Sequence, residues 1–143
     1  MAFFSVRRDK KIIYGADTGL IASGSISFAS GDNLTTEKKT SAIELANGTI
    51  LHPDSLFLLA IEKPQEDTAG DLTIYTYNII KIDGTNEREV LHTTHTVEKI
   101  AGSDTYRDFL IQGLFVGEGK IKIGAKFAAD SGAIEVKYKL YRL

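Results

Sequence analysis

The chain has 143 residues, 43% of them hydrophobic, and a formal net charge of -2. This size suits one domain with one core, and the small charge argues against long-range attraction to nucleic acid or an anionic membrane. The absence of cysteine excludes disulfide bonds, thiolate zinc sites and a cysteine nucleophile.

The first residues predict an extended N-terminal arm and a short first strand within residues 1–15. In this arm, Phe3 and Phe4 precede a run of basic residues. Exposed phenylalanines would be sticky, so we expect both to be buried on the parent domain or on another subunit. The order of charge and apolar residues does not fit a secretory signal, so we expect synthesis in the cytoplasm.

Turn residues then divide the chain at spacings typical of an all-β domain. Residues 20–29 alternate between apolar and small polar side chains, as in a strand. A hairpin is predicted around Asn47-Gly48, which lies between two short β-like segments. Residues 56–61 form a nearly continuous apolar run, which favours a central strand.

The second half continues the pattern of period two. Residues 71–82 alternate, with Tyr75, Tyr77 and Ile79 on one side. The other side carries Leu72, Ile74, Thr76, Asn78, Ile80 and Ile82. Residues 89–100 are rich in threonine and valine, as in a strand. A further strand is predicted within residues 106–116.

The last segment, Lys120–Leu143, alternates most strictly and contains a central turn, so a final hairpin is predicted there. Helical periodicity is almost absent. The pattern as a whole predicts nine or ten strands in an all-β, antiparallel β-sandwich of jelly-roll type. Residues 16–143 are expected to form this single domain.

Candidate catalytic and metal-binding groups are few. His92 and His95 are three residues apart, which on a regular strand places them on opposite faces and disfavours a shared metal ion. His52 and Asp54 neighbour each other in a loop, but a catalytic triad requires three groups that converge in space. Several carboxylates near residues 62–71 lack the spacing of a calcium loop. We therefore predict no catalytic residue, no metal and no cofactor.

Charge is unevenly distributed: the two ends of the chain are basic and the centre is acidic. This polarity favours contacts between acidic loops of one copy and basic faces of a neighbour. Alternatively, lysines on the outer face of a terminal strand serve to discourage edge-to-edge aggregation. On the first interpretation, the residues that contact a subunit or partner include Phe3, Phe4, Arg7, Arg8, Lys10 and Lys11.

Ligand recognition by aromatic side chains is a second possibility. The chain has no tryptophan, but Tyr75 and Tyr77 share one strand face and could stack on a glycan. Packing between strands is the competing explanation for both tyrosines.

The chain resembles in style the accessory virion proteins of tailed bacteriophages, such as capsid decoration (cement) proteins. The features that carry the resemblance are the arm Met1–Arg8, the Asn47-Gly48 turn and the Lys120–Leu143 hairpin. The resemblance implies oligomerisation, frequently as a homotrimer, and binding to a symmetric protein lattice such as a capsid or tail, without catalysis.

The sequence therefore predicts a non-enzymatic structural or interaction subunit whose final location is the virion, with no nucleic acid or membrane as partner. The alternative is a glycan- or cell-surface-binding module that uses Tyr75 and Tyr77 or the loop residues 64–70. A third class, a hydrolase that uses His52 and Asp54, fits the sequence least well.

Overall fold

A computed structural model describes six parts of the chain: residues 20–44, 56–62, 70–98, 108–115, 119–128 and 133–142. The predicted arm and first strand, and the Asn47-Gly48 turn, lie outside these parts. The described residues form strands and no helix. They therefore include no helix that is long and apolar enough to cross a membrane.

Nine strands occur within the described ranges, and all their pairings are antiparallel. They are β1 (Leu20–Phe28), β2 (Lys38–Lys39), β3 (Ile43–Glu44), β4 (Leu56–Glu62), β5 (Leu72–Ile80), β6 (Arg88–Val97), β7 (Phe109–Leu114), β8 (Lys120–Phe127) and β9 (Ile134–Arg142).

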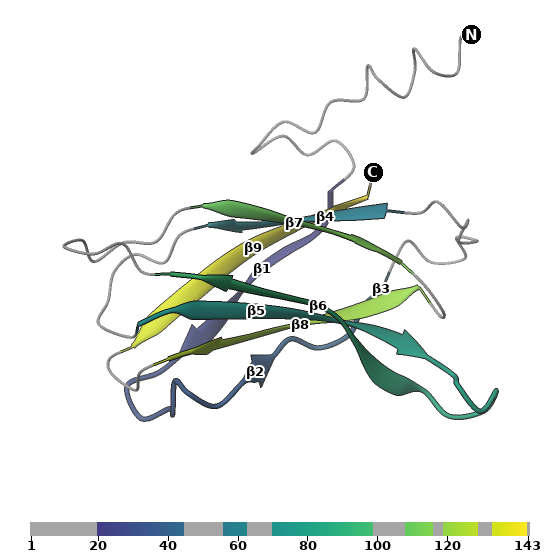
Figure 1. The fold of residues 1–143 in the computed structure, drawn as a ribbon, viewed down its shortest axis with the longest axis horizontal. Helices are drawn as coiled ribbons and strands as arrows, with labels where there is room; N and C mark the ends of the chain where they lie inside the picture. Colours follow the sequence, from purple (N-terminus) through teal and green to yellow (C-terminus); the bar gives the residue numbers. More distant parts are fainter. Residues whose placement is uncertain are drawn as a thin grey trace, which may run out of the picture.

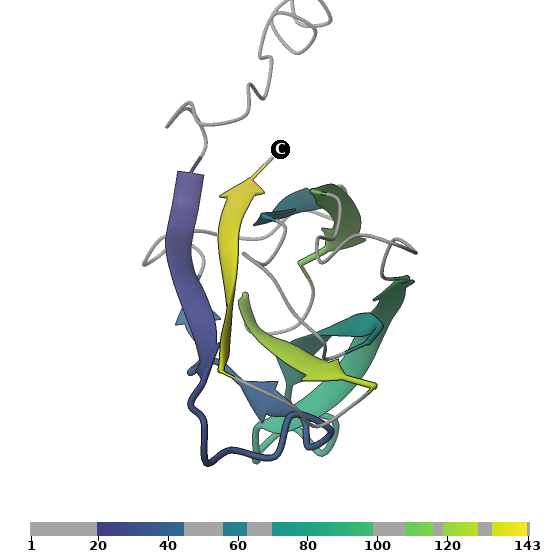
Figure 2. The ribbon, with the colours of Figure 1, turned by 90° about the vertical axis from the view of Figure 1, so that its left-hand side faces the viewer.

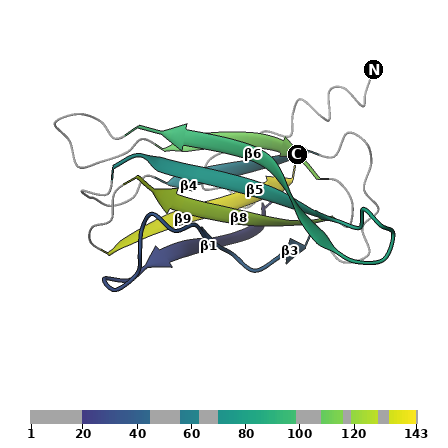
Figure 3. The same ribbon diagram turned by 60° about the horizontal axis from the view of Figure 1, so that its bottom comes forward.

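The strands make two sheets that lie face to face (Figure 1). The four-stranded sheet has the order β1-β9-β4-β7. The five-stranded sheet has the order β2-β8-β5-β6, and β3 also pairs with β8. Figure 3 shows β6, β5 and β8 in this order, with the other sheet behind them. The predicted all-β, antiparallel class is confirmed; the sheets do not close into a barrel.

The core lies between the sheets and is built from the predicted alternate residues. In β8 and β9, for example, the inward positions carry Ile121, Ile123, Val136 and Leu140, none of which is exposed to solvent. Alternation places these side chains on one face because successive strand residues point to opposite sides. Residues 56–61 also occupy the predicted central position, because β4 lies between β9 and β7.

The predicted hairpin over Lys120–Leu143 is wrong. β8 pairs with β5, β2 and β3 in one sheet, whereas β9 pairs with β1 and β4 in the other. Alternation tells which face of each strand is apolar, but it does not tell which sheet the strand belongs to. Here the apolar face of β8 and the apolar face of β9 contact the same core from opposite sides. Both strands are interior, so their lysines do not protect a sheet edge, as one interpretation of the charges had required.

Candidate interaction surfaces

The sequence-predicted contact residues are only partly covered by the structure. The arm residues Phe3, Phe4, Arg7, Arg8, Lys10 and Lys11 lie outside the described residues, and so do His52 and Asp54. The described part offers three features that bear on function: the outer face of each sheet and the junction between β6 and β7.

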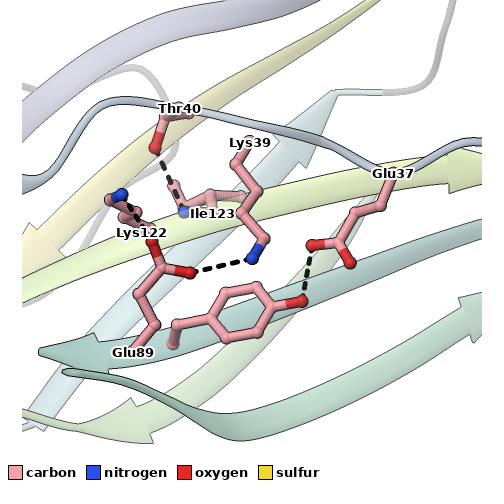
Figure 4. Close-up of polar contacts among 7 residues, drawn as sticks. Glu37, Lys39, Thr40, Glu89, Lys122 and Ile123 are labelled. Carbon is pink, nitrogen blue, oxygen red and sulfur yellow. Dashed lines mark hydrogen bonds and ion pairs between the residues drawn. The ribbon is translucent and has the colours of Figure 1, made fainter.

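Ion pairs cover the outer face of the five-stranded sheet. The carboxylate of Glu89 accepts hydrogen bonds from the Nζ atoms of Lys122 at 2.5 Å and Lys39 at 2.8 Å (Figure 4). These two bonds, first that of Lys122, lower the pKa of Glu89 below its usual value. On the same sheet, Lys120 Nζ lies 2.9 Å from a carboxylate oxygen of Glu87. Charges on this face therefore largely neutralise each other.

Tyr77 belongs to the same network. Its hydroxyl donates a hydrogen bond of 2.5 Å to Glu37, and Lys39 Nζ lies 4.3 Å from the centre of its ring (Figure 4). Burial, and next the bond to Glu37, raise the pKa of the Tyr77 hydroxyl. Tyr75 stacks on Tyr77 with ring centres 6.3 Å apart. A glycan that stacked on Tyr77 would therefore have to displace Lys39 from its ring.

The segment that carries Glu37 and Lys39 is fixed to β8. Thr40 N–H donates to the Ile123 carbonyl at 2.8 Å, and Ile123 N–H donates to Thr40 Oγ1 at 3.1 Å (Figure 4). The Glu37 side chain crosses over Gly124, where a Cβ atom would overlap its carboxylate. A glycine in the middle of β8 thus makes room for the acid that holds Tyr77.

The outer face of the four-stranded sheet is divided into a polar and an apolar half. In register, Leu20 pairs with Tyr141, which pairs with Leu58, while Ala60 pairs with Leu110. Further along the sheet, the same face carries serines and charged residues. We call the following residues the apolar half: Leu20, Leu56, Leu58, Ala60, Leu110, Leu114 and Tyr141. Two polar residues lie among them on the same face, since Gln112 pairs with Leu58 and Lys139 pairs with Ala60. The polar half comprises Ser25, Ser27, Glu62, Glu135 and Lys137.

Two leucines of the apolar half are open to solvent: Leu110 is 49% exposed and Leu114 is 36% exposed. Tyr141 is only 1% exposed although it does not belong to the core cluster between the sheets. Its buried hydroxyl has no hydrogen-bond partner among the described residues. A buried hydroxyl without a partner is costly, which marks this face as unusual for the outside of a sheet.

The two histidines on β6 join the sheets at the β6–β7 junction. The β5–β6 register shifts between Thr76 and Tyr77, so that His92 is an extra residue on β6. Because this bulge changes the alternation, both histidines reach β7, contrary to the prediction of opposite faces. The His95 ring stacks on Phe109 with ring centres 5.1 Å apart.

His92 and Asn78 bind the backbone of Leu114 from the opposite sheet. Leu114 N–H donates to His92 Nε2 at 3.1 Å, and Asn78 Nδ2 donates to the Leu114 carbonyl at 3.2 Å. Through these bonds, His92 and Asn78 connect the five-stranded sheet to β7 of the other sheet. Within the described ranges, no group of three or more histidine, aspartate or glutamate side chains could hold a metal ion.

The apolar half was missed from the sequence, although one signal for it exists. Residues 56–61 are apolar on both faces of the strand, and a strand with one wet face would alternate instead. No protein-family model, curated protein or solved structure matches this chain.

Proposed function

We propose that this chain is a non-enzymatic structural subunit of a viral particle, a capsid decoration or other accessory virion protein that self-associates and binds a protein lattice. The strand order supports a β-sandwich of the jelly-roll type. Successive strands alternate between the sheets except at the short pair β2 and β3, which both pair with β8, and at the β5–β6 hairpin. In the other sheet, β1 lies beside β9 while β4 lies beside β7. Jelly rolls of this kind recur in viral capsid domains, which is an analogy of fold and not of sequence.

The apolar half is the observation that carries the proposal. An antiparallel sheet normally keeps its outer face polar, yet Leu110 and Leu114 expose apolar surface there. Leu110 pairs with Ala60 and Leu114 with Leu56. Apolar patches rimmed by polar residues mark protein interaction sites. The opposite face, with its ion pairs, suits contact with water. The two faces would thus orient the subunit, with the four-stranded sheet against its partner.

The N-terminal residues fit the same role. Leu20, the first residue of β1, belongs to the apolar half. In our proposal, Phe3 and Phe4 insert into an apolar groove of a neighbouring subunit. The basic residues that follow them pair with acidic residues there; they are Arg7, Arg8, Lys10 and Lys11.

A lattice-binding experiment tests this function. Particles of the encoding virus, purified from a strain that lacks this gene, are incubated with the purified chain and sedimented again. We expect the wild type to co-sediment and Leu110→Lys to lose most of its binding, because the variant buries an unpaired charge. Thr94→Lys, at an exposed position of β6 in the other sheet, is the matched control and should bind normally. Wild-type protein that stays in the supernatant would contradict the proposal.

A further inference from the structure

The free edge of β1 is the second surface that could bind another molecule. β1 is an outermost strand of the four-stranded sheet, and β9 is its one partner among the described strands (Figure 2). Its residues Ser23, Gly24 and Ser25 are all exposed, in contrast to the alternating burial of Ile26–Phe28. An open edge presents backbone N–H and C=O groups in the spacing that another strand needs.

One hydrogen bond identifies which backbone groups face the free edge. Lys38, which lies in the other sheet, donates from Nζ to the carbonyl oxygen of Ser27 at 2.8 Å. Because Lys38 approaches from outside the β1–β9 pair, the backbone groups of Ser27 point away from β9. Strand residues two apart repeat this direction. The backbone groups of Ser23 and Ser25 therefore point to the free edge, and those of Gly24 and Ile26 point to β9.

The other outermost strands carry features that oppose pairing. β2 and β3 have two residues each; both residues of β2 are lysines, and β3 ends with Glu44. β6 contains a bulge and begins with Arg88 and Glu89, and β7 is bound at Leu114 by side chains of the opposite sheet. Charged residues and proline are usual means of protecting an edge strand. The nine residues of β1 include neither.

We propose that β1 pairs antiparallel with β1 of a second copy of this chain, which joins two four-stranded sheets into one continuous sheet. The inference rests on the self-association in our proposed function and specifies its geometry. In a dimer with a two-fold axis, both copies contribute the same strand to the contact, because an isologous interface is self-complementary. With the Ser27 carbonyl occupied by Lys38, the free groups are centred on Ser23 and Ser25. Pairing Ser23 of one copy with Ser25 of the other uses the backbone groups of both.

Proline substitution separates edge pairing from folding. Ser25→Pro removes an N–H that faces the free edge, and such positions tolerate proline. We expect the variant to fold, with an unchanged far-ultraviolet circular dichroism spectrum, and its dimer dissociation constant to rise at least about tenfold, since two equivalent hydrogen bonds are lost. Ser25→Ala keeps the N–H and should dimerise like the wild type. Ile26→Pro removes an N–H that faces β9 and should impair folding instead.

Cysteine cross-linking provides a second measurement that does not depend on the proline. The chain has no cysteine of its own, so a Ser23→Cys/Ser25→Cys variant places the only thiols at the edge. Mild oxidation should convert it to a covalent dimer, since directly opposed strand residues lie within disulfide reach. Thr94→Cys on β6 should stay monomeric under the same conditions.

The two proposals fail by different results. A wild-type chain that is monomeric by light scattering at all concentrations, or a Ser25→Pro variant that dimerises normally, overturns the edge pairing. Neither result contradicts a subunit that assembles only on its lattice, which is judged by co-sedimentation of the wild type and of Leu110→Lys. A dimer that Ser25→Pro disrupts, from a chain that binds no particles, would sustain the edge pairing and contradict the viral function.

Discussion

Replacing Gly113 by alanine tests how tightly β7 is packed against β4. Gly113 pairs in register with Phe57, whose side chain is fully buried. A Cβ atom at position 113 would lie 2.7 Å from Phe57 Cε2, closer still to Cζ, and 3.1 Å from His92 Cδ2. The Phe57 ring cannot easily retreat, because it packs against Phe115 with ring centres 5.3 Å apart. The backbone of β7 must therefore move outward.

The cost has two main parts. Overpacking of a filled core costs about 1–3 kcal/mol, and a displaced β7 weakens the Leu114 N–H bond to His92, which contributes about 1 kcal/mol. The lower entropy of an unfolded chain with alanine offsets about 0.5 kcal/mol of this. We expect Gly113→Ala to lower the free energy of unfolding by about 2 kcal/mol, and Tm by roughly 6–8 °C for a chain of this length.

Urea unfolding, followed by circular dichroism, measures the change. Gly31→Ala is the control, since a Cβ atom there has no neighbour within 4 Å. In a Phe57→Leu background the clashing ring is gone. Adding Gly113→Ala to Phe57→Leu should therefore lower the free energy of unfolding by less than about 0.5 kcal/mol relative to Phe57→Leu alone. The reasoning is refuted if Gly113→Ala and Gly31→Ala have equal stability, or if the cost is the same in both backgrounds.

Two further predictions concern the ionic face. The pKa of Glu89 is lowered by Lys122 and Lys39, so its contribution to stability is present above the usual glutamate value of 4.5 and is lost as the pH falls below it. Glu89→Gln should therefore flatten the dependence of urea stability on pH between about 5 and 3, and an unchanged slope would contradict the role of these bonds. Tyr77→Phe removes the bond to Glu37 and should cost about 1 kcal/mol. Burial also raises the pKa of the Tyr138 hydroxyl, so an ultraviolet titration of the wild type should find both tyrosines resisting ionisation near pH 10, and Tyr77→Phe should have one resistant tyrosine fewer.

The sequence alone determined the class of fold and the inward face of most strands. Alternation in residues 20–29, 71–82 and 120–143 predicted most of the buried side chains of β1, β5, β8 and β9, because a half-buried strand must alternate. It was wrong at and just after the end of β5, where Ile79 is buried on the other face and Ile82 is 68% exposed. The apolar run at residues 56–61 predicted an interior strand for the same reason. Each of these predictions depends only on neighbours along one strand.

Partners across the sheets were decided by tertiary structure. Nothing in the period of β8 or β9 tells whether they pair with each other, and the expected hairpin is wrong because the two strands lie on opposite sides of one core. The bulge at His92 likewise reverses the side to which a histidine points, and a local repeat cannot register one inserted residue.

The surfaces most relevant to function also arise from these non-local pairings. Leu58 of β4, Leu110 of β7 and Tyr141 of β9 are far apart in the sequence and meet only because β4 lies between the other two strands. The open edge of β1 exists because its one described partner is β9, near the opposite end of the chain. Periodicity fixes the face of a strand, whereas strand order, which requires contacts between distant residues, decides which faces and edges remain available to a partner.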